Sequence, residues 1–246
     1  MNTRLLALVM MLFAVTLFAC APVAETPDAP AQAADAGAAE EPAAGGHDHP
    51  MDADDRDAWS KPSEVYAFLG IGAGNRVVDL MSGGGYNAVR LAELVGPEGR
   101  VVAERGSEEL QGRLADDGDL AAVDNLEVVS GLDAIADASM SHVVAVRAYH
   151  LFPDVPAVLA QLYRVLEPGG VVGIVEVRLN EPEGHDMESH RMGEGTVIAD
   201  MEAAGFEFVE ESDLLRIGGD DYSLYMPADG TRYMTDRMLL SFRKPQ

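Results

Sequence analysis

The chain has 246 residues, of which 48% are hydrophobic and 24% are charged, and this balance is typical of a globular protein rather than a disordered one. Its formal net charge of −25 repels phosphate backbones and no basic patch is present in the sequence, so nucleic acid is not an expected partner. The single cysteine, Cys20, excludes an intrachain disulfide.

The first twenty residues form an export signal in this interpretation. Residues 1–4 carry a weak positive charge, and residues 5–18 are apolar almost throughout. A run of this length is short for a membrane span and suits a signal peptide. Ala19 followed by Cys20 resembles the bacterial lipoprotein processing site, which implies cleavage before Cys20, acylation of its thiol and, with Ala21 next, a periplasmic protein anchored to the outer membrane. The alternative is an ordinary secretory signal, cleaved after Ala19 or Ala21, which also implies export.

Residues 21–55 predict a disordered tether. They are mainly Ala, Pro, Gly and acidic residues, and they cannot bury enough apolar surface to offset the entropy of ordering. A flexible chain of this length spans roughly 30–35 Å, which would hold a folded domain near the membrane. His47 and His49 lie in this segment without a third ligand that is held in a fixed position, so no metal site is expected. The folded domain is predicted to occupy residues 56–246.

Within that domain, short apolar runs alternate with helical patterns. A helix is predicted to begin at Ser60-Lys61-Pro62 and to end at Gly70. Strands are predicted at 76–80, 100–104, 126–129, 142–146 and 171–175, with helices at 87–95, after Ser107 and at 154–166. A helix at 193–204 and strands at 206–211 and 237–242 follow. This order predicts a doubly wound (Rossmann-like) α/β domain, with a mostly parallel sheet of about seven strands and helices on both faces.

The first predicted strand leads into a glycine-rich turn. It reads Val77-Val78-Asp79-Leu80 and continues as Met81-Ser82-Gly83-Gly84-Gly85-Tyr86. Glycines let a backbone pass close to a ligand and adopt positive φ. The following helix would direct free N–H groups at an anionic group of that ligand. A ligand site is therefore predicted here, at the carboxyl end of the strand.

This strand, acid and turn resemble the first motif of class I S-adenosylmethionine-dependent methyltransferases, and residues 56–245 as a whole resemble an exported group of such proteins. The resemblance implies S-adenosylmethionine as cofactor. It also implies a set of cofactor-binding residues: Asp79, Ser82, Gly83, Gly85, Tyr86, Glu104 and Asp133. Asp79 would meet the amino group of the cofactor, Glu104 the ribose hydroxyls and Asp133 the adenine. Met81 departs from the motif, which usually has its first glycine there, and this implies a wider turn or weaker binding.

Two residues after the fourth predicted strand are candidates for catalysis. Tyr149 and His150 would lie beside the sulfonium in a fold of this kind. Methyl transfer needs an aligned acceptor and often a base, and an imidazole ionises near neutral pH. His150 is therefore a candidate base and Tyr149 a candidate for positioning the acceptor, while structural packing of both is the alternative.

The predicted function is methyl transfer from S-adenosylmethionine to an unidentified small-molecule acceptor. One alternative is an NAD(P)-dependent oxidoreductase, because residues 83–88 satisfy G-x-G-x-x-A and Glu104 suits a ribose-binding acid. Another is a methyltransferase fold used only for binding in the cell envelope, where the supply of the methyl donor is uncertain. The sequence leaves the acceptor atom and the oligomeric state open.

Overall fold

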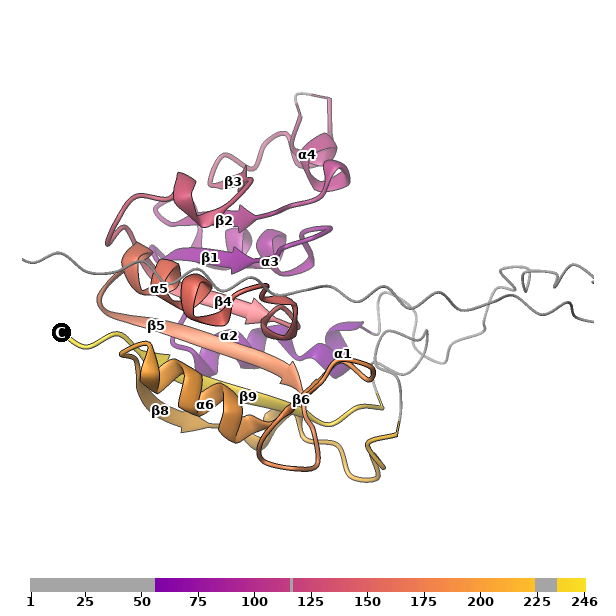
Figure 1. The fold of residues 1–246 in the computed structure, drawn as a ribbon. Helices are drawn as coiled ribbons and strands as arrows, with labels where there is room; N and C mark the ends of the chain where they lie inside the picture. Colours follow the sequence, from indigo (N-terminus) through magenta and orange to yellow (C-terminus); the bar gives the residue numbers. More distant parts are fainter. Residues whose placement is uncertain (1–55, 116, 224–233) are drawn as a thin grey trace, which may run out of the picture. The chain divides into compact units, whose positions relative to one another are not determined.

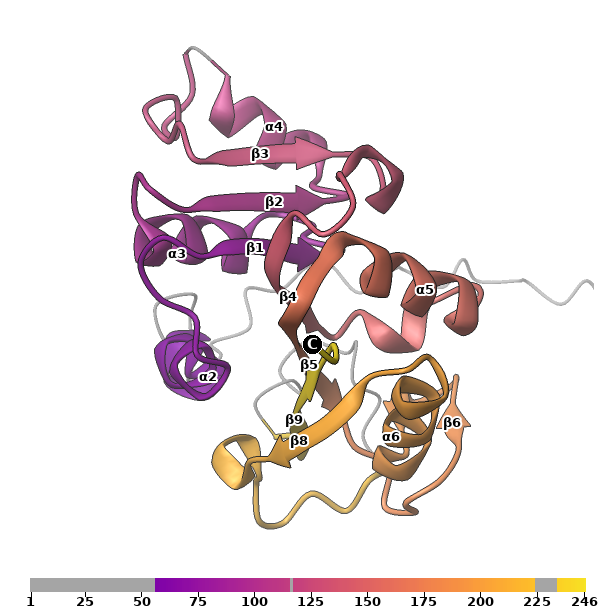
Figure 2. The same ribbon diagram turned by 90° about the vertical axis from the view of Figure 1, so that its left-hand side faces the viewer.

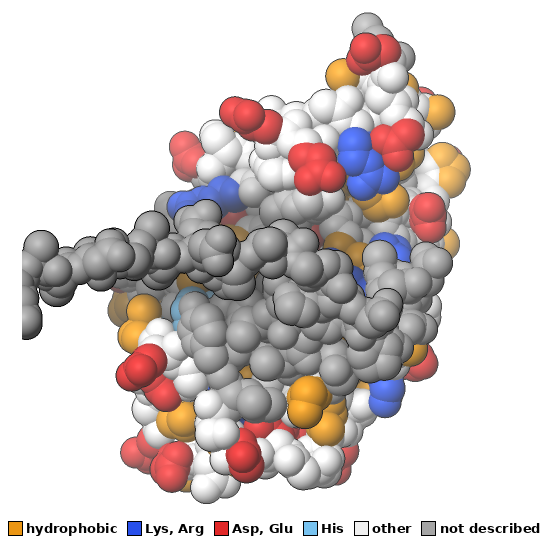
Figure 3. Space-filling model, turned by 90° about the vertical axis from the view of Figure 1, so that its right-hand side faces the viewer, with side chains coloured by type: hydrophobic (Ala, Val, Ile, Leu, Met, Phe, Trp, Pro, Cys, Tyr) orange, Lys and Arg blue, Asp and Glu red, His pale blue; other side chains and the backbone are white. Residues whose placement is uncertain are grey.

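A computed structural model of the chain describes residues 56–115, 117–223 and 234–246. The predicted signal peptide, the lipidation of Cys20 and the predicted tether lie outside the described residues. Among the residues described, no helix has the length and apolar character required to cross a membrane. Figure 3 shows one face of the molecule, on which acidic side chains are widely spread and basic side chains are fewer.

One sheet of seven strands organises the domain, in the order β3-β2-β1-β4-β5-β9-β8 (Figure 1). Its strands are β1 (Arg76–Leu80), β2 (Arg100–Glu104), β3 (Leu126–Val129), β4 (Met140–Val146), β5 (Leu166–Val177), β8 (Glu207–Glu211) and β9 (Arg237–Arg243). The first five strands pair in parallel, and β9 runs antiparallel between β5 and β8. The prediction of a doubly wound, mostly parallel sheet of about seven strands is confirmed.

Helices cover both faces of this sheet, as Figure 2 shows. They are α1 (Arg56–Ser60), α2 (Pro62–Phe68), α3 (Tyr86–Val95), α4 (Glu108–Leu114), α5 (Val155–Val165) and α6 (Glu194–Ala203), with 3₁₀ turns η1 (Leu132–Ala134), η2 (Tyr149–Leu151) and η3 (Asp213–Leu215). Val77 and Val78 of β1 belong to different hydrophobic clusters, one with α2 and α3 and the other with α5 and α6. Because successive strand residues point to opposite faces, a strand buried on both sides is apolar throughout.

The structure differs from the sequence prediction at three places. Lys61 takes a left-handed conformation, with φ 47°, directly before α2, and the short helix α1, which the sequence did not predict, precedes it. Strand β5 begins at Leu166 instead of residue 171 because Leu166 pairs with Met140, while residues 167–170 bulge from the pairing with β4. A short hairpin of β6 (His185–Asp186) and β7 (Arg191–Met192) follows β5, and strands of two residues are too short to show a sequence pattern.

Candidate active site

A cleft of about 440 Å³ opens at the carboxyl ends of β1 and β4. Its walls come from the turn after β1, the start of α3, the segment after β4, and residues of α1 and the β6–β7 hairpin region: Asp79, Met81, Ser82, Gly83, Gly84, Tyr86, Asn87, Arg147, His150, Leu151, Arg56 and His190 among them. The order of strands reverses between β1 and β4, and such switch points are where doubly wound sheets bind ligands. The volume suits a small organic ligand or cofactor.

The glycine-rich turn packs closely against the end of β2. Ser82 donates its backbone N–H to the carbonyl of Glu104 at 2.8 Å, and Ser107 donates its own to the carbonyl of Gly83 at 2.8 Å. Gly85 has φ 79°, and a Cβ there would lie 2.6 Å from Cδ1 of Leu110. Glycine is therefore required at position 85 by both backbone conformation and space.

Asp79 is buried beneath this turn and holds it in shape. Ser82 Oγ donates to Asp79 Oδ2 at 2.6 Å, and the backbone N–H of Ala88 is a further hydrogen-bond partner. Burial raises the pKa of Asp79 to about 7, and the bonds from Ser82 and Ala88 only partly oppose that increase. A cation bound in the cleft would therefore stabilise the ionised form of this carboxyl.

Glu104 ends β2 and meets the turn at the adjacent strand tip. Met81 donates its backbone N–H to Glu104 Oε2 at 3.1 Å, and Arg105 Nε lies 3.0 Å from Glu104 Oε1. Burial raises the pKa of Glu104, which is 3% exposed, whereas the Arg105 side chain is largely exposed. A nucleoside that hydrogen-bonds to Glu104 would have to displace the Arg105 guanidinium, and an exposed side chain can move at little cost.

Met81 takes the backbone conformation that a glycine favours. Its φ is 51°, and Arg105 and Arg147, which likewise directly follow strands, have φ of 51° and 53°. A left-handed conformation costs a non-glycine residue roughly 1–2 kcal/mol. Residues strained in this way often cluster at functional sites. The turn after β1 thus has a glycine-like shape despite the methionine at position 81.

The other predicted residues lie at different distances from the cleft. Tyr86 lines it, with its ring between the guanidiniums of Arg56 and Arg90, 3.5 and 3.9 Å from the ring centroid. Asp133 lies in η1 after β3, is exposed and does not line the cleft. Tyr149 is buried away from the cleft wall and donates its hydroxyl to Asp200 Oδ2 of α6 at 2.9 Å. In the structure Tyr149 therefore packs against α6 outside the lining of the cleft.

His150 does line the cleft, and it is paired with an acid that the sequence analysis did not single out. Nδ1 of His150 lies 3.0 Å from Glu176 Oε2, and both side chains are buried. Glu176 Oε1 accepts the backbone N–H of Val177 at 3.0 Å. A carboxylate at Nδ1 keeps the proton on that nitrogen and leaves Nε2 as the basic one. The sequence does contain a signal for this pair. Glu176 is the single acidic residue in the apolar run 171–177 of β5, and a buried carboxylate requires a partner.

Comparison with known proteins identifies methyltransferases among the relatives of this chain. Residues 77–170 match the methyltransferase domain family. The chain is 29% identical over 157 residues to an arsenite methyltransferase of Halobacterium salinarum, covering 58% of this chain and 40% of that protein. It is 25% identical over 190 residues to a sterol 24-C-methyltransferase of Schizosaccharomyces pombe, covering 66% of this chain and 47% of that protein. The chain thus spans less than half the length of either relative.

A solved structure shows the same fold. The S-adenosylmethionine-dependent methyltransferase of Aquifex aeolicus matches with a TM-score of 0.59 and 18% sequence identity, over 76% of this chain and 92% of that one. At this identity the match establishes the arrangement of strands and helices. The chemistry of the present chain has to be argued from the residues at its own cleft.

Proposed function

We propose that this protein, which carries a class I S-adenosylmethionine-dependent methyltransferase domain, transfers the methyl group of S-adenosylmethionine to a small-molecule acceptor. One observation carries the proposal: the glycine turn after Asp79 and the acid Glu104 meet at neighbouring strand tips beside a cleft of suitable size. The relatives reported above are all methyltransferases and give no support to the oxidoreductase alternative.

The residues at and next to the cleft fit this cofactor. Gly83 and Gly84 let a ligand approach the backbone, and Asp79 supplies a carboxyl for the positive end. Glu104 does not line the cleft itself, but it accepts from Met81, which does, and would supply an acceptor for ribose hydroxyls. When bound, S-adenosylmethionine supplies an electrophilic methyl group on a sulfonium. Asp133 is kept as a proposed adenine contact because it follows β3 at the same edge of the sheet.

We assign His150 the role of base. An acceptor that receives the methyl group would have to lose a proton, and Nε2 of His150 would take up that proton. Glu176 is a positioning residue, which holds the proton on Nδ1 and stabilises the imidazolium that forms. Both groups are held by the pairing of β4 with β5, since η2 follows β4 and Glu176 lies in β5.

The acceptors of the two named relatives do not transfer to this chain. Arsenite and sterols differ in chemistry, and trivalent arsenic is a soft centre that favours thiolate ligands. The only cysteine of this sequence is Cys20, outside the described domain. We therefore propose a small-molecule acceptor other than arsenite.

The test of the proposed function is calorimetric titration of the whole chain with S-adenosylmethionine, its demethylated product S-adenosylhomocysteine, and NAD⁺. We expect both sulfur nucleosides to bind and NAD⁺ to fail. The opposite order would support the oxidoreductase. Binding of the methyl donor without its consumption in the presence of any acceptor would favour a protein that only binds it.

The titration is expected to depend on pH through Asp79. Its pKa of about 7 lies above the unfolded value of 3.8, so folding takes up a proton between these values and the ligand-free protein loses stability as pH rises through this window. S-adenosylmethionine is cationic and favours the ionised carboxylate, so its affinity should rise with pH up to about 7, by at most about tenfold per pH unit. Asp79→Asn should bind weakly and show a flat profile over this range, and a steep profile in that variant would refute the assignment.

We also propose export and lipid anchoring through Cys20, on the basis of the apolar segment and the Ala19-Cys20 junction. Two or three acyl chains would anchor the protein stably, because each buried methylene contributes about 0.8 kcal/mol. Mass spectrometry of the mature protein should find an acylated N-terminus at Cys20, and Cys20→Ser should lack it. An unmodified N-terminus at Ala21 or beyond would show an ordinary secretory signal instead.

A further inference from the structure

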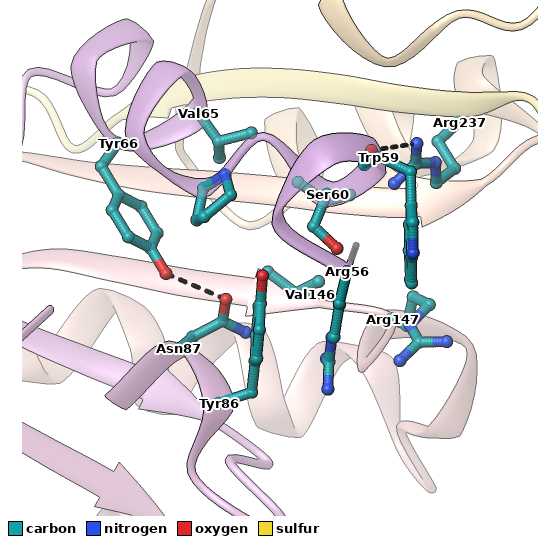
Figure 4. Close-up of a pocket in the computed structure, with 12 residues that line it drawn as sticks. Arg56, Trp59, Ser60, Val65, Tyr66, Tyr86, Asn87, Val146, Arg147 and Arg237 are labelled. Atoms are coloured by element: carbon teal, nitrogen blue, oxygen red, sulfur yellow. Dashed lines mark hydrogen bonds between the residues drawn. The ribbon is translucent and has the colours of Figure 1, made fainter. Parts of the chain in front are cut away.

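A small second chamber adjoins the cleft at the same edge of the sheet, drawn in Figure 4. Its volume is about 20 Å³, enough for one water-sized group. Arg56, Tyr86, Asn87, Val146 and Arg147 line both the chamber and the cleft, so the two spaces share a wall. The chamber is thus placed next to the cofactor site, where a methyl acceptor has to be held.

Arg237 lies in this chamber because of the direction of β9. That strand runs antiparallel to β5, and its first residue, Arg237, pairs with Val177 at the carboxyl edge of the sheet. The side chain is 4% exposed, and its Nη2 donates to the carbonyl of Trp59 at 2.7 Å. Its guanidinium lies 5.2 Å from the centroid of the Trp59 ring. Arg237 is therefore a buried cation held between α1 and the sheet.

Within the described part of the chain, no carboxylate forms an ion pair with Arg237, and its buried Nε has no hydrogen-bond partner there. The neighbouring Asp236 carboxyl is used by Arg178 at 2.7 Å and by Arg216 at 3.6 Å. By contrast, the fully buried Arg191 is paired with Asp220 at 2.9 Å. Burial lowers the pKa of Arg237 to about 10.

A buried charge without a counter-charge is costly, and it is usually paired or used. This chain has 42 acidic residues against 17 basic ones, so acids to pair with are abundant. The side chains of Arg56 and Arg147 also line the chamber, next to Arg237. An anionic group of a ligand would supply the partner that the described residues do not give Arg237.

We propose that Arg237 binds the carboxylate of the methyl acceptor, and that the acceptor is a small apolar carboxylic acid. The identification of this ligand as the methyl acceptor rests on the proposed function. The carboxylate site itself rests on the geometry around Arg237. A chamber of this volume admits a carboxylate oxygen and not a whole phosphate group. Its remaining walls include Trp59, Val65 and Val175, so the part of the acceptor next to the carboxylate meets apolar side chains, and the rest of the acceptor would lie in the adjoining cleft.

Butyrate is the probe, with butyramide as its neutral isostere and inorganic phosphate as a second anion. The full chain is titrated with each, and binding is followed by thermal shift. We expect butyrate to stabilise the wild type, and butyramide and phosphate to have no effect. Equal effects of butyrate and butyramide, or stabilisation by phosphate alone, would overturn the proposal.

Arg237→Met should weaken butyrate binding about tenfold or more, as expected for loss of a charge-assisted hydrogen bond. The matched control is Arg243→Met, which makes the same change at an exposed position at the other end of β9 and should bind butyrate as the wild type does. Full wild-type affinity for butyrate in Arg237→Met would contradict the site. If Arg237→Met does not fold, Arg237→Lys replaces it, because lysine keeps the charge and should retain part of the butyrate binding.

Titration of the wild type with S-adenosylmethionine separates this proposal from the proposed function. Binding of the methyl donor without any response to butyrate refutes the carboxylate site alone. Binding of butyrate without the methyl donor refutes the methyltransferase function and leaves the anion site in place.

Discussion

Replacement of His150 by alanine is expected to slow methyl transfer by about 10²–10⁴-fold, the usual contribution of a positioned base. His150 lines the cleft, and Glu176 holds its Nδ1 at 3.0 Å, so this variant removes the group proposed to take the acceptor's proton. Binding of S-adenosylmethionine should persist, because Asp79, the glycine turn and Glu104 stay in place. The assay follows label from methyl-labelled S-adenosylmethionine into the small-molecule fraction of a cell extract.

Glu176→Gln tests whether the carboxylate acts through the histidine. The amide keeps the size of the side chain but removes the charge that stabilises the imidazolium, so transfer should fall while affinity for the methyl donor stays. The control is Glu207→Gln, the same change at an exposed position of β8. Transfer at the wild-type rate in both His150→Ala and Glu176→Gln would exclude the dyad from catalysis.

Glu104→Ala is expected to abolish most of the thermal stabilisation that S-adenosylmethionine and S-adenosylhomocysteine give the wild type. Glu104 lies at the tip of β2 against the glycine turn, where it is proposed to accept hydrogen bonds from the ribose hydroxyls. A hydrogen bond to a charged group contributes about 1.5–3 kcal/mol, which corresponds to roughly 10- to 150-fold in affinity. The thermal shift is measured with each ligand on both proteins.

The alanine variant also removes an acceptor for the backbone N–H of Met81, which could loosen the turn. Glu104→Gln separates the two effects, because its amide oxygen still accepts from Met81 while the charge is lost, and it should bind with intermediate affinity. Glu98→Ala is the control, since Glu98 is exposed in the turn before the opposite end of β2. Unchanged ligand shifts in both Glu104 variants would rule out the proposed nucleoside site.

The sequence alone determined the elements whose burial leaves a local pattern. Strands β1 and β2 begin and end where their apolar runs predict, because strands covered on both faces have no polar side to obscure their limits. The glycine turn was readable for the same reason, since backbone conformation at Gly83 and Gly85 restricts the residue type locally. Glu104 could be named as a candidate ribose-binding residue because it ends a predicted strand.

Which side chains meet depends on contacts between elements that are far apart in the sequence. Tyr149 and His150 are neighbours at the end of β4, and the sequence favoured neither. In the 3₁₀ turn η2, successive side chains point about 120° apart. His150 therefore reaches the cleft and Glu176, while Tyr149 reaches Asp200 of α6. The site of Arg237 likewise depends on the antiparallel insertion of β9 beside β5, a long-range pairing that leaves no trace in the residues around it.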